Sequence, residues 1–125
     1  GYDAIAPVPV ASHAEILRVQ ALVPRIFVEE SVLAFLLQLV TATRTEAAFR
    51  TGVSVRGGLA LKTAAQARAL LRGRDFVIPE DITQLVPAVL AHRLVLAHPP
   101  GDALEARGAI EATLRQIVAR IPAPV

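Results

Sequence analysis

The chain has 125 residues, of which 54% are hydrophobic and 19% charged, and its formal net charge is only +2. This balance excludes a disordered chain and disfavours a nucleic-acid binder that works by charge alone. The absence of cysteine excludes disulfides, thiolate zinc sites and cysteine nucleophiles, and favours a cytoplasmic location. The length predicts one domain with its own core.

The first 11 residues carry Pro7 and Pro9 among small apolar residues, which predicts a linker (1–11) ahead of one helical domain (12–125). The N-terminus lacks the basic and sustained apolar regions of a signal peptide. The most apolar run, Val32 to Val40, is far shorter than the roughly 20 residues of a membrane span. We therefore expect no membrane segment.

Two helices are predicted in the N-terminal third. Ser12 and Glu15 form an S-x-x-E capping box, so a helix should begin there and end near Val23, before Pro24. A short extended piece should follow at 25–28. Apolar residues then recur at helical spacing, which predicts a second helix with one buried stripe: Val32, Phe35, Leu36, Leu39 and Val40.

A third, long helix is predicted between Ser54 as N-cap and Gly73 as the residue after its C-terminus. Its expected packing stripe consists mostly of small residues: Ala60, Ala64, Ala67 and Leu71. The next segment, Phe76–Ile78, is short and β-prone, with Phe76 and Val77 expected in the core. It could pair with residues 25–28 as a minimal ribbon.

The C-terminal part is divided by prolines. Pro79 should begin a fourth helix that Pro87 kinks or divides. Residues 92–96 should be extended, and 97–102 should form a surface loop. A final helix should end before Pro122, with this apolar stripe: Ile110, Leu114, Ile117, Val118 and Ile121. The fold class is therefore all-α, a compact bundle of about five helices with at most one very short strand pair.

No catalytic constellation stands out in the sequence. It contains no phosphate-binding loop, no dinucleotide-binding glycine motif and no H-E-x-x-H motif. The three histidines, His13, His92 and His98, have no zinc-ligand spacing, which favours surface or capping roles over a metal site. The chain alone is not expected to be an enzyme.

One segment, GVSVRGG, breaks local rules. Arg56 would lie at the unfavourable end of the helix dipole, and Gly57 and Gly58 each cost about 1 kcal/mol relative to alanine inside a helix. One interpretation is a guanidinium left free for phosphate oxygens, with glycines that leave room for a ligand. The other is that Arg56 pairs with Glu46 or Glu29 and that the glycines allow close helix packing.

Over residues 52–96 the sequence resembles the C-terminal lid subdomain of the MoxR family of AAA+ ATPases. The matching stretch is GVSVRGGLALKTAAQARALLRGRDFVIPEDITQLVPAVLAHRL. Family members typically read G-x-S-P-R-A-x-L-A-L, then A-x-L-x-G-R-D-[YF]-V-x-P-[ED]-D-[VI], then P-x-V-x-x-H-R-L. The order of the upstream elements also fits the family, so the resemblance extends over most of the chain.

The resemblance implies that Arg56 is the sensor 2 residue of an ATPase, with Ser54, Arg56 and Gly57 in contact with nucleotide. Val55 replaces the family proline, and Gly57 and Gly58 replace alanine and a small residue, which predicts a looser first turn. It further implies a longer parent with a P-loop subdomain that binds ATP or ADP with Mg²⁺, and a hexameric, chaperone-like ring. Partners would include proteins with von Willebrand factor A domains. The chain alone should hold no cofactor.

Two other functions compete with this interpretation. The apolar surplus would also suit a helical protein-interaction module without a nucleotide role. A helix-turn-helix DNA-binding module is the weaker alternative, based on Arg68, Arg72 and Arg74 near one helix end. It is disfavoured because the net charge is small and no aromatic or Asn/Gln array accompanies the arginines.

Overall fold

Prolines, caps and glycines divide the chain into helices of unequal length. The computed structural model describes residues 12–125, so the expected 1–11 linker lies outside the described residues. The elements are α1 (His13–Leu22), η2 (Val23–Arg25), α2 (Glu30–Thr45), β1 (Phe49–Thr51), α3 (Val55–Leu71), α4 (Pro79–Thr83), α5 (Val86–Leu90), η3 (Ala91–Arg93), β2 (Val95–Leu96) and α6 (Ala103–Arg120).

The predicted all-α fold is confirmed within residues 12–125. Six α-helices occur there rather than about five, because the predicted fourth helix is two helices, α4 and α5. Pro87 lies in the first turn of α5, where its missing N–H costs nothing. None of the helices in this range is long and apolar enough to span a bilayer.

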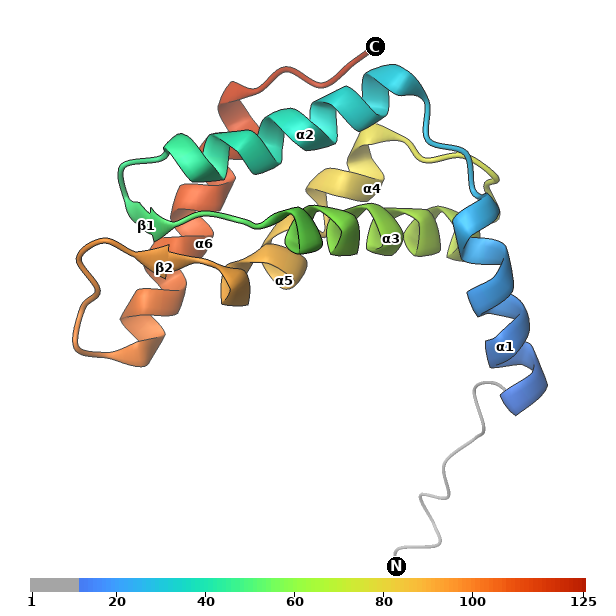
Figure 1. Cartoon of the computed structure of the whole chain (residues 1–125), viewed down its shortest axis with the longest axis horizontal. Helices are drawn as coiled ribbons and strands as arrows, with labels where there is room; N and C mark the ends of the chain where they lie inside the picture. Colours follow the sequence, from blue (N-terminus) through green and yellow to red (C-terminus); the bar gives the residue numbers. More distant parts are fainter. Residues whose placement is uncertain (1–11) are drawn as a thin grey trace, which may run out of the picture.

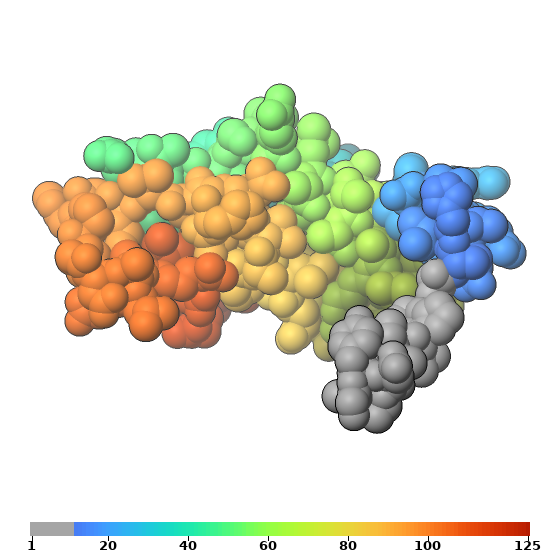
Figure 2. Space-filling model, turned by 90° about the horizontal axis from the view of Figure 1, so that it is seen from below, coloured from blue at the N-terminus to red at the C-terminus, as the bar shows by residue number. Residues whose placement is uncertain are grey.

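The long helices α2 and α3 lie side by side, with α4 and α5 against α3, and the third long helix, α6, packs on α2 and α5 (Figure 1). The first helix, α1, buries none of its residues and lies at one end of the molecule. The segment after β2 lies at the opposite end (Figure 2). The two ends of α3 therefore lie in different parts of the molecule. They are about 25 Å apart, because the helix has 17 residues.

The core confirms the predicted α2 stripe but corrects the one on α3. All five apolar residues predicted for α2 are buried, as are Ile110, Leu114 and Ile117 of α6. On α3 the buried apolar side chains are instead Leu61, Ala65 and Ala69, whereas Leu71 is 79% exposed. An alanine-rich helix is mildly apolar on every side, so its neighbours decide which face is buried.

Two short backbone pairings join segments outside the α-helices. The predicted ribbon between 25–28 and 76–78 is confirmed as a single parallel bridge, Phe27 to Phe76. A second pairing was not predicted: β1 and β2 are antiparallel, with Phe49 opposite Leu96. Segments of two and three residues are too short to show a strand period in the sequence.

The predicted end of α3 is confirmed in detail. Gly73 has φ of +75°, the left-handed conformation that favours glycine. The amide of Arg74 donates to the carbonyl of Ala69, and the amide of Gly73 donates to that of Leu70, each at 2.9 Å. This is the Schellman arrangement, which turns the chain sharply toward α4.

Candidate functional site

The start of α3 is stabilised by an N-terminal cap. Ser54 lies in extended conformation, and its Oγ accepts a hydrogen bond from the amide of Gly57 at 3.3 Å. The amide of Gly58 donates to the Ser54 carbonyl at 3.0 Å. Arg56 is exposed in this first turn, next to Val55, which is 69% exposed. The three predicted nucleotide-contact residues, Ser54, Arg56 and Gly57, thus share one turn.

Two side chains of α2 bind the backbone of Val53, the residue that precedes this turn. Buried Thr43 accepts a hydrogen bond from the amide of Val53 at 3.0 Å and donates to the Val40 carbonyl at 2.6 Å. Arg44 Nε donates to the Val53 carbonyl at 2.7 Å. Both backbone polar groups of Val53 are therefore bound by α2. These hydrogen bonds could not be predicted from the sequence, because Thr43 and Arg44 look like solvated polar residues until α2 and α3 are placed together.

Glycines in this segment allow close packing. A Cβ on Gly52 would lie 2.6 Å from the Arg44 Cα, and a Cβ on Gly57 would lie 2.6 Å from Val53 Cγ1 and 3.1 Å from Arg93 Cδ. A Cβ on Gly58 would lie 3.6 Å from Val40, an ordinary contact. The close-packing interpretation thus applies to Gly57.

The predicted ion pairs of Arg56 do not form. Glu46 instead accepts hydrogen bonds from the Ala48 amide and from Arg120, at 3.3 and 3.2 Å, and both lower the pKa of its carboxyl group. Glu29 lies beside Phe27 and Phe76. Among residues 12–125 no ion pair or side-chain hydrogen bond involves Arg56. Its guanidinium is free to meet a group from outside the described part of the chain.

An apolar groove of about 170 Å³ lies between α2 and the start of α3. Its exposed apolar side chains include Leu37 and Leu59, each more than half exposed. The full lining is Leu33, Leu36, Leu37, Val40, Thr41, Arg44, Val55, Gly58, Leu59 and Lys62. Contiguous apolar surface of this kind typically marks an interface.

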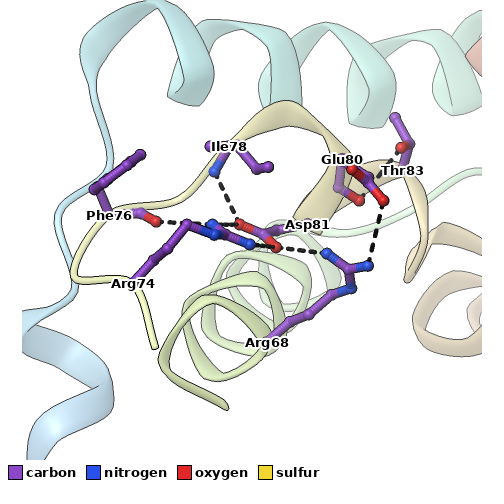
Figure 3. Close-up of polar contacts among 7 residues, drawn as sticks. All are labelled: Arg68, Arg74, Phe76, Ile78, Glu80, Asp81 and Thr83. Carbon is purple, nitrogen blue, oxygen red and sulfur yellow. Dashed lines mark hydrogen bonds and ion pairs between the residues drawn. The ribbon is translucent and has the colours of Figure 1, made fainter. Parts of the chain in front are cut away.

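The C-terminal end of α3 holds a buried ionic cluster (Figure 3). Asp81 is fully buried and accepts hydrogen bonds from Arg68 at 2.6 Å, from Arg74 at 2.6 Å to each oxygen, and from the Ile78 amide at 2.8 Å. Glu80 lies 3.6 Å from Arg68. Burial by itself would raise the pKa of Asp81, but the hydrogen bonds from Arg74, Ile78 and Arg68 outweigh it, and the pKa is lowered.

This cluster gives a structural role to most of the family-like stretch G-R-D-F-V-I-P-E-D. It ties the last turn of α3 to the start of α4 through one carboxylate. It also weakens the DNA-binding alternative, since two of that alternative's three arginines, Arg68 and Arg74, are bound to Asp81. The histidines His13, His92 and His98 are exposed, and no group of three or more His, Cys, Asp or Glu suited to a metal occurs within residues 12–125.

Comparison with known proteins gives a consistent result. The family model of the AAA lid domain matches residues 41–116, a range that contains both ends of α3. The protein YeaC of Bacillus subtilis is 37% identical over 94% of this chain, and the chaperone MoxR1 of Mycobacterium tuberculosis is 32% identical over 92% of it. A solved structure from Cytophaga hutchinsonii, assigned as an ATPase, superposes with a TM-score of 0.76 at 25% identity over 90% of this chain.

These relatives are much longer than the chain. It covers 36% of YeaC, 32% of MoxR1 and 36% of the Cytophaga protein. The match therefore concerns one region of each relative. Because the family model covers more than half of the chain, and both relatives match over most of it, the chain belongs to the AAA lid domain family, in the form found in MoxR-like proteins.

Proposed function

We propose that this chain is the lid of an AAA+ ATPase and that Arg56 is its sensor 2 residue. The observation that carries the proposal is the exposed guanidinium of Arg56, which has no partner among residues 12–125 although its helix turn is capped and the preceding Val53 is bound by α2. A free arginine on a rigid support is suited to phosphate oxygens, which its planar fork can bind in pairs.

The residues of this turn would supply one side of a nucleotide-binding site. In the parent protein, ATP with Mg²⁺ would be held by a P-loop subdomain, which supplies the phosphoryl-transfer site. Arg56 would reach the γ-phosphate and stabilise the negative charge that redistributes in the transition state. Ser54 keeps its hydroxyl hydrogen as a donor, because its Oγ only accepts from Gly57. The Gly57 amide, already bound to Ser54, would line the site without a further hydrogen bond.

We further propose that the groove between α2 and α3 packs against the remainder of the AAA+ protein. It begins at Val55, next to Arg56, so a surface that covers it would bring a neighbouring subdomain close to the guanidinium. Such packing would carry nucleotide state into movement of the lid as a rigid body. By the family resemblance, the parent would form a hexameric ring in the cytoplasm, act as a chaperone and engage proteins with von Willebrand factor A domains.

Steady-state ATP hydrolysis by the full-length protein tests the sensor role. We expect Arg56→Ala to lower kcat by about tenfold to a hundredfold, with a smaller change in nucleotide affinity, because the charge acts mainly in the transition state. Arg72→Ala is the matched control, an exposed arginine at the opposite end of the same helix. Normal turnover by Arg56→Ala would contradict the sensor role and favour a protein-interaction module that uses the apolar groove alone.

A further inference from the structure

Two of the four phenylalanines are exposed and lie side by side at the end of the molecule away from Arg56. Phe27 is 63% exposed and Phe76 is 46% exposed, and their backbones form the parallel bridge between the two segments. The prediction that Phe76 lies in the core is wrong, because only Val77 of the pair Phe76 and Val77 is buried. Large aromatic side chains left in water on neighbouring segments typically mark a surface that binds a partner.

The two rings are presented on a rigid support. The amide of Phe27 donates to the Asp75 carbonyl at 2.9 Å, and the amide of Val77 donates to the Phe27 carbonyl at 2.8 Å. Arg74 Nη1 donates to the Phe76 carbonyl at 3.1 Å, and Arg74 itself is held by buried Asp81. Figure 3 shows the Phe76 side chain directed away from this cluster. Little conformational entropy would be lost when a partner binds here.

The charged side chains that line the hollow beside the rings are both carboxylates. This hollow of about 420 Å³ is lined by Phe27, Glu29, Asp75, Phe76 and Val77. Arg74, whose guanidinium contacts the Phe76 carbonyl, is paired with Asp81. Aromatic faces with carboxylates beside them attract cations, and a planar guanidinium can stack on a ring while it pairs with a carboxylate.

We propose that this aromatic–acidic hollow docks an arginine-bearing segment of a separate partner protein. The hollow lies near the C-terminal end of α3, a helix about 25 Å long that has Arg56 in its first turn, so it can be occupied while the nucleotide-facing end is in use. The inference is independent of the sensor 2 role, because it rests on residues at the other end of the helix.

The probe for this proposal is a pair of matched peptides, acetyl-Gly-Arg-Gly-amide and the same peptide with neutral citrulline in place of arginine. In a titration of the ¹⁵N-labelled chain, the arginine peptide should shift the amides of Phe27 and residues 75–77 in a saturable manner. The citrulline peptide should bind about threefold to tenfold more weakly, because it stacks without charge. Equal binding of both peptides, or shifts located elsewhere, would overturn the proposal.

Three variants separate the parts of the site. Phe27→Leu and Phe76→Leu keep apolar bulk at exposed positions, so they should fold normally and weaken binding of the arginine peptide about threefold or more. The double variant Glu29→Gln with Asp75→Asn should remove the preference for arginine over citrulline. Glu105→Gln on α6 is the matched control, an exposed acid outside the hollow, and should change nothing.

Two outcomes would assign the hollow to a different occupant and overturn the proposal. If the same amides shift with protein concentration alone, the hollow binds a second copy of the chain. If saturation-transfer NMR on the arginine peptide detects binding to this chain but not to the full-length protein, another part of the same protein covers the hollow. Binding to both is the expected result.

Discussion

The two ends of α3 use arginine in opposite ways. At the C-terminal end, Arg68 and Arg74 enclose buried Asp81 and join α3 to α4. At the N-terminal end, Arg56 has no partner among residues 12–125, although the backbone beneath it is bound by Thr43 and Arg44 of α2. Arg68 and Arg74 thus stabilise the fold through their ion pairs with Asp81. The guanidinium of Arg56, by contrast, is available to bind another group.

The largest expected effect is at the C-terminal end. Asp81→Asn should lower the free energy of unfolding by about 2–4 kcal/mol, because it leaves two partly buried arginines without their carboxylate. Urea denaturation of the chain measures this loss. Asp75→Asn, an exposed aspartate in the preceding turn, is the control and should stay within about 0.5 kcal/mol. A loss below about 1 kcal/mol for Asp81→Asn would mean that the cluster does not hold the fold.

The same cluster predicts a pH dependence of stability. The pKa of Asp81 is lowered in the folded state, so its ionised form stabilises the fold above the unfolded-state pKa of about 3.9. This contribution should be lost as the pH falls through the folded-state pKa. Unfolding free energies measured from pH 7 downward should therefore converge for the wild type and Asp81→Asn. A constant gap down to pH 2 would assign the stabilisation to something other than the charge.

A smaller effect is expected where α3 begins. Gly57→Ala should cost about 1–3 kcal/mol, because its Cβ would collide with buried Val53. Gly58→Ala, one residue later, should be neutral or stabilising by up to about 1 kcal/mol, since its Cβ has room and alanine favours the helix. Melting temperatures of the two variants test this. Equal losses would mean that the packing around Gly57 is not what requires glycine.

The smallest expected effect on stability is at Arg56 itself. Arg56→Ala should change the unfolding free energy of the chain by less than about 0.5 kcal/mol, since the side chain is exposed and unpaired within residues 12–125. A loss above about 1 kcal/mol would reveal a partner inside the domain and remove the contrast between the two ends of α3. Together with the ATPase measurement, this variant separates a functional arginine from a structural one.

Local signals in the sequence predicted most of the helix boundaries. Ser54 caps α3, Gly73 ends it in a left-handed conformation, and Pro87 divides the predicted fourth helix, each as expected. These signals act within one or two turns, so the residues that carry them are close in sequence. The stripe on α2 was equally predictable, because its large apolar residues repeat with the helical period.

The candidate site was only partly predictable. The sequence marked Arg56 as unusual, and family resemblance supplied its role, but neither indicated what holds its turn in place. That support comes from Thr43 and Arg44 on another helix. The buried face of α3 was wrongly predicted for a related reason. Alanine occurs on several sides of this helix, so the sequence does not show which side is buried, and the packing partners determine it.

The sequence by itself determined most of the helix boundaries, and that an arginine stands in the first turn of α3. The tertiary structure decided which charges are paired: Glu46 binds Arg120, from the far end of the chain, and leaves Arg56 free. It also decided that Phe76 lies on the surface beside Phe27. The physical reason is the distance along the chain over which each interaction acts. Caps and turn residues act on neighbouring backbone groups, whereas ion pairs and exposure depend on segments that meet only after the helices have packed.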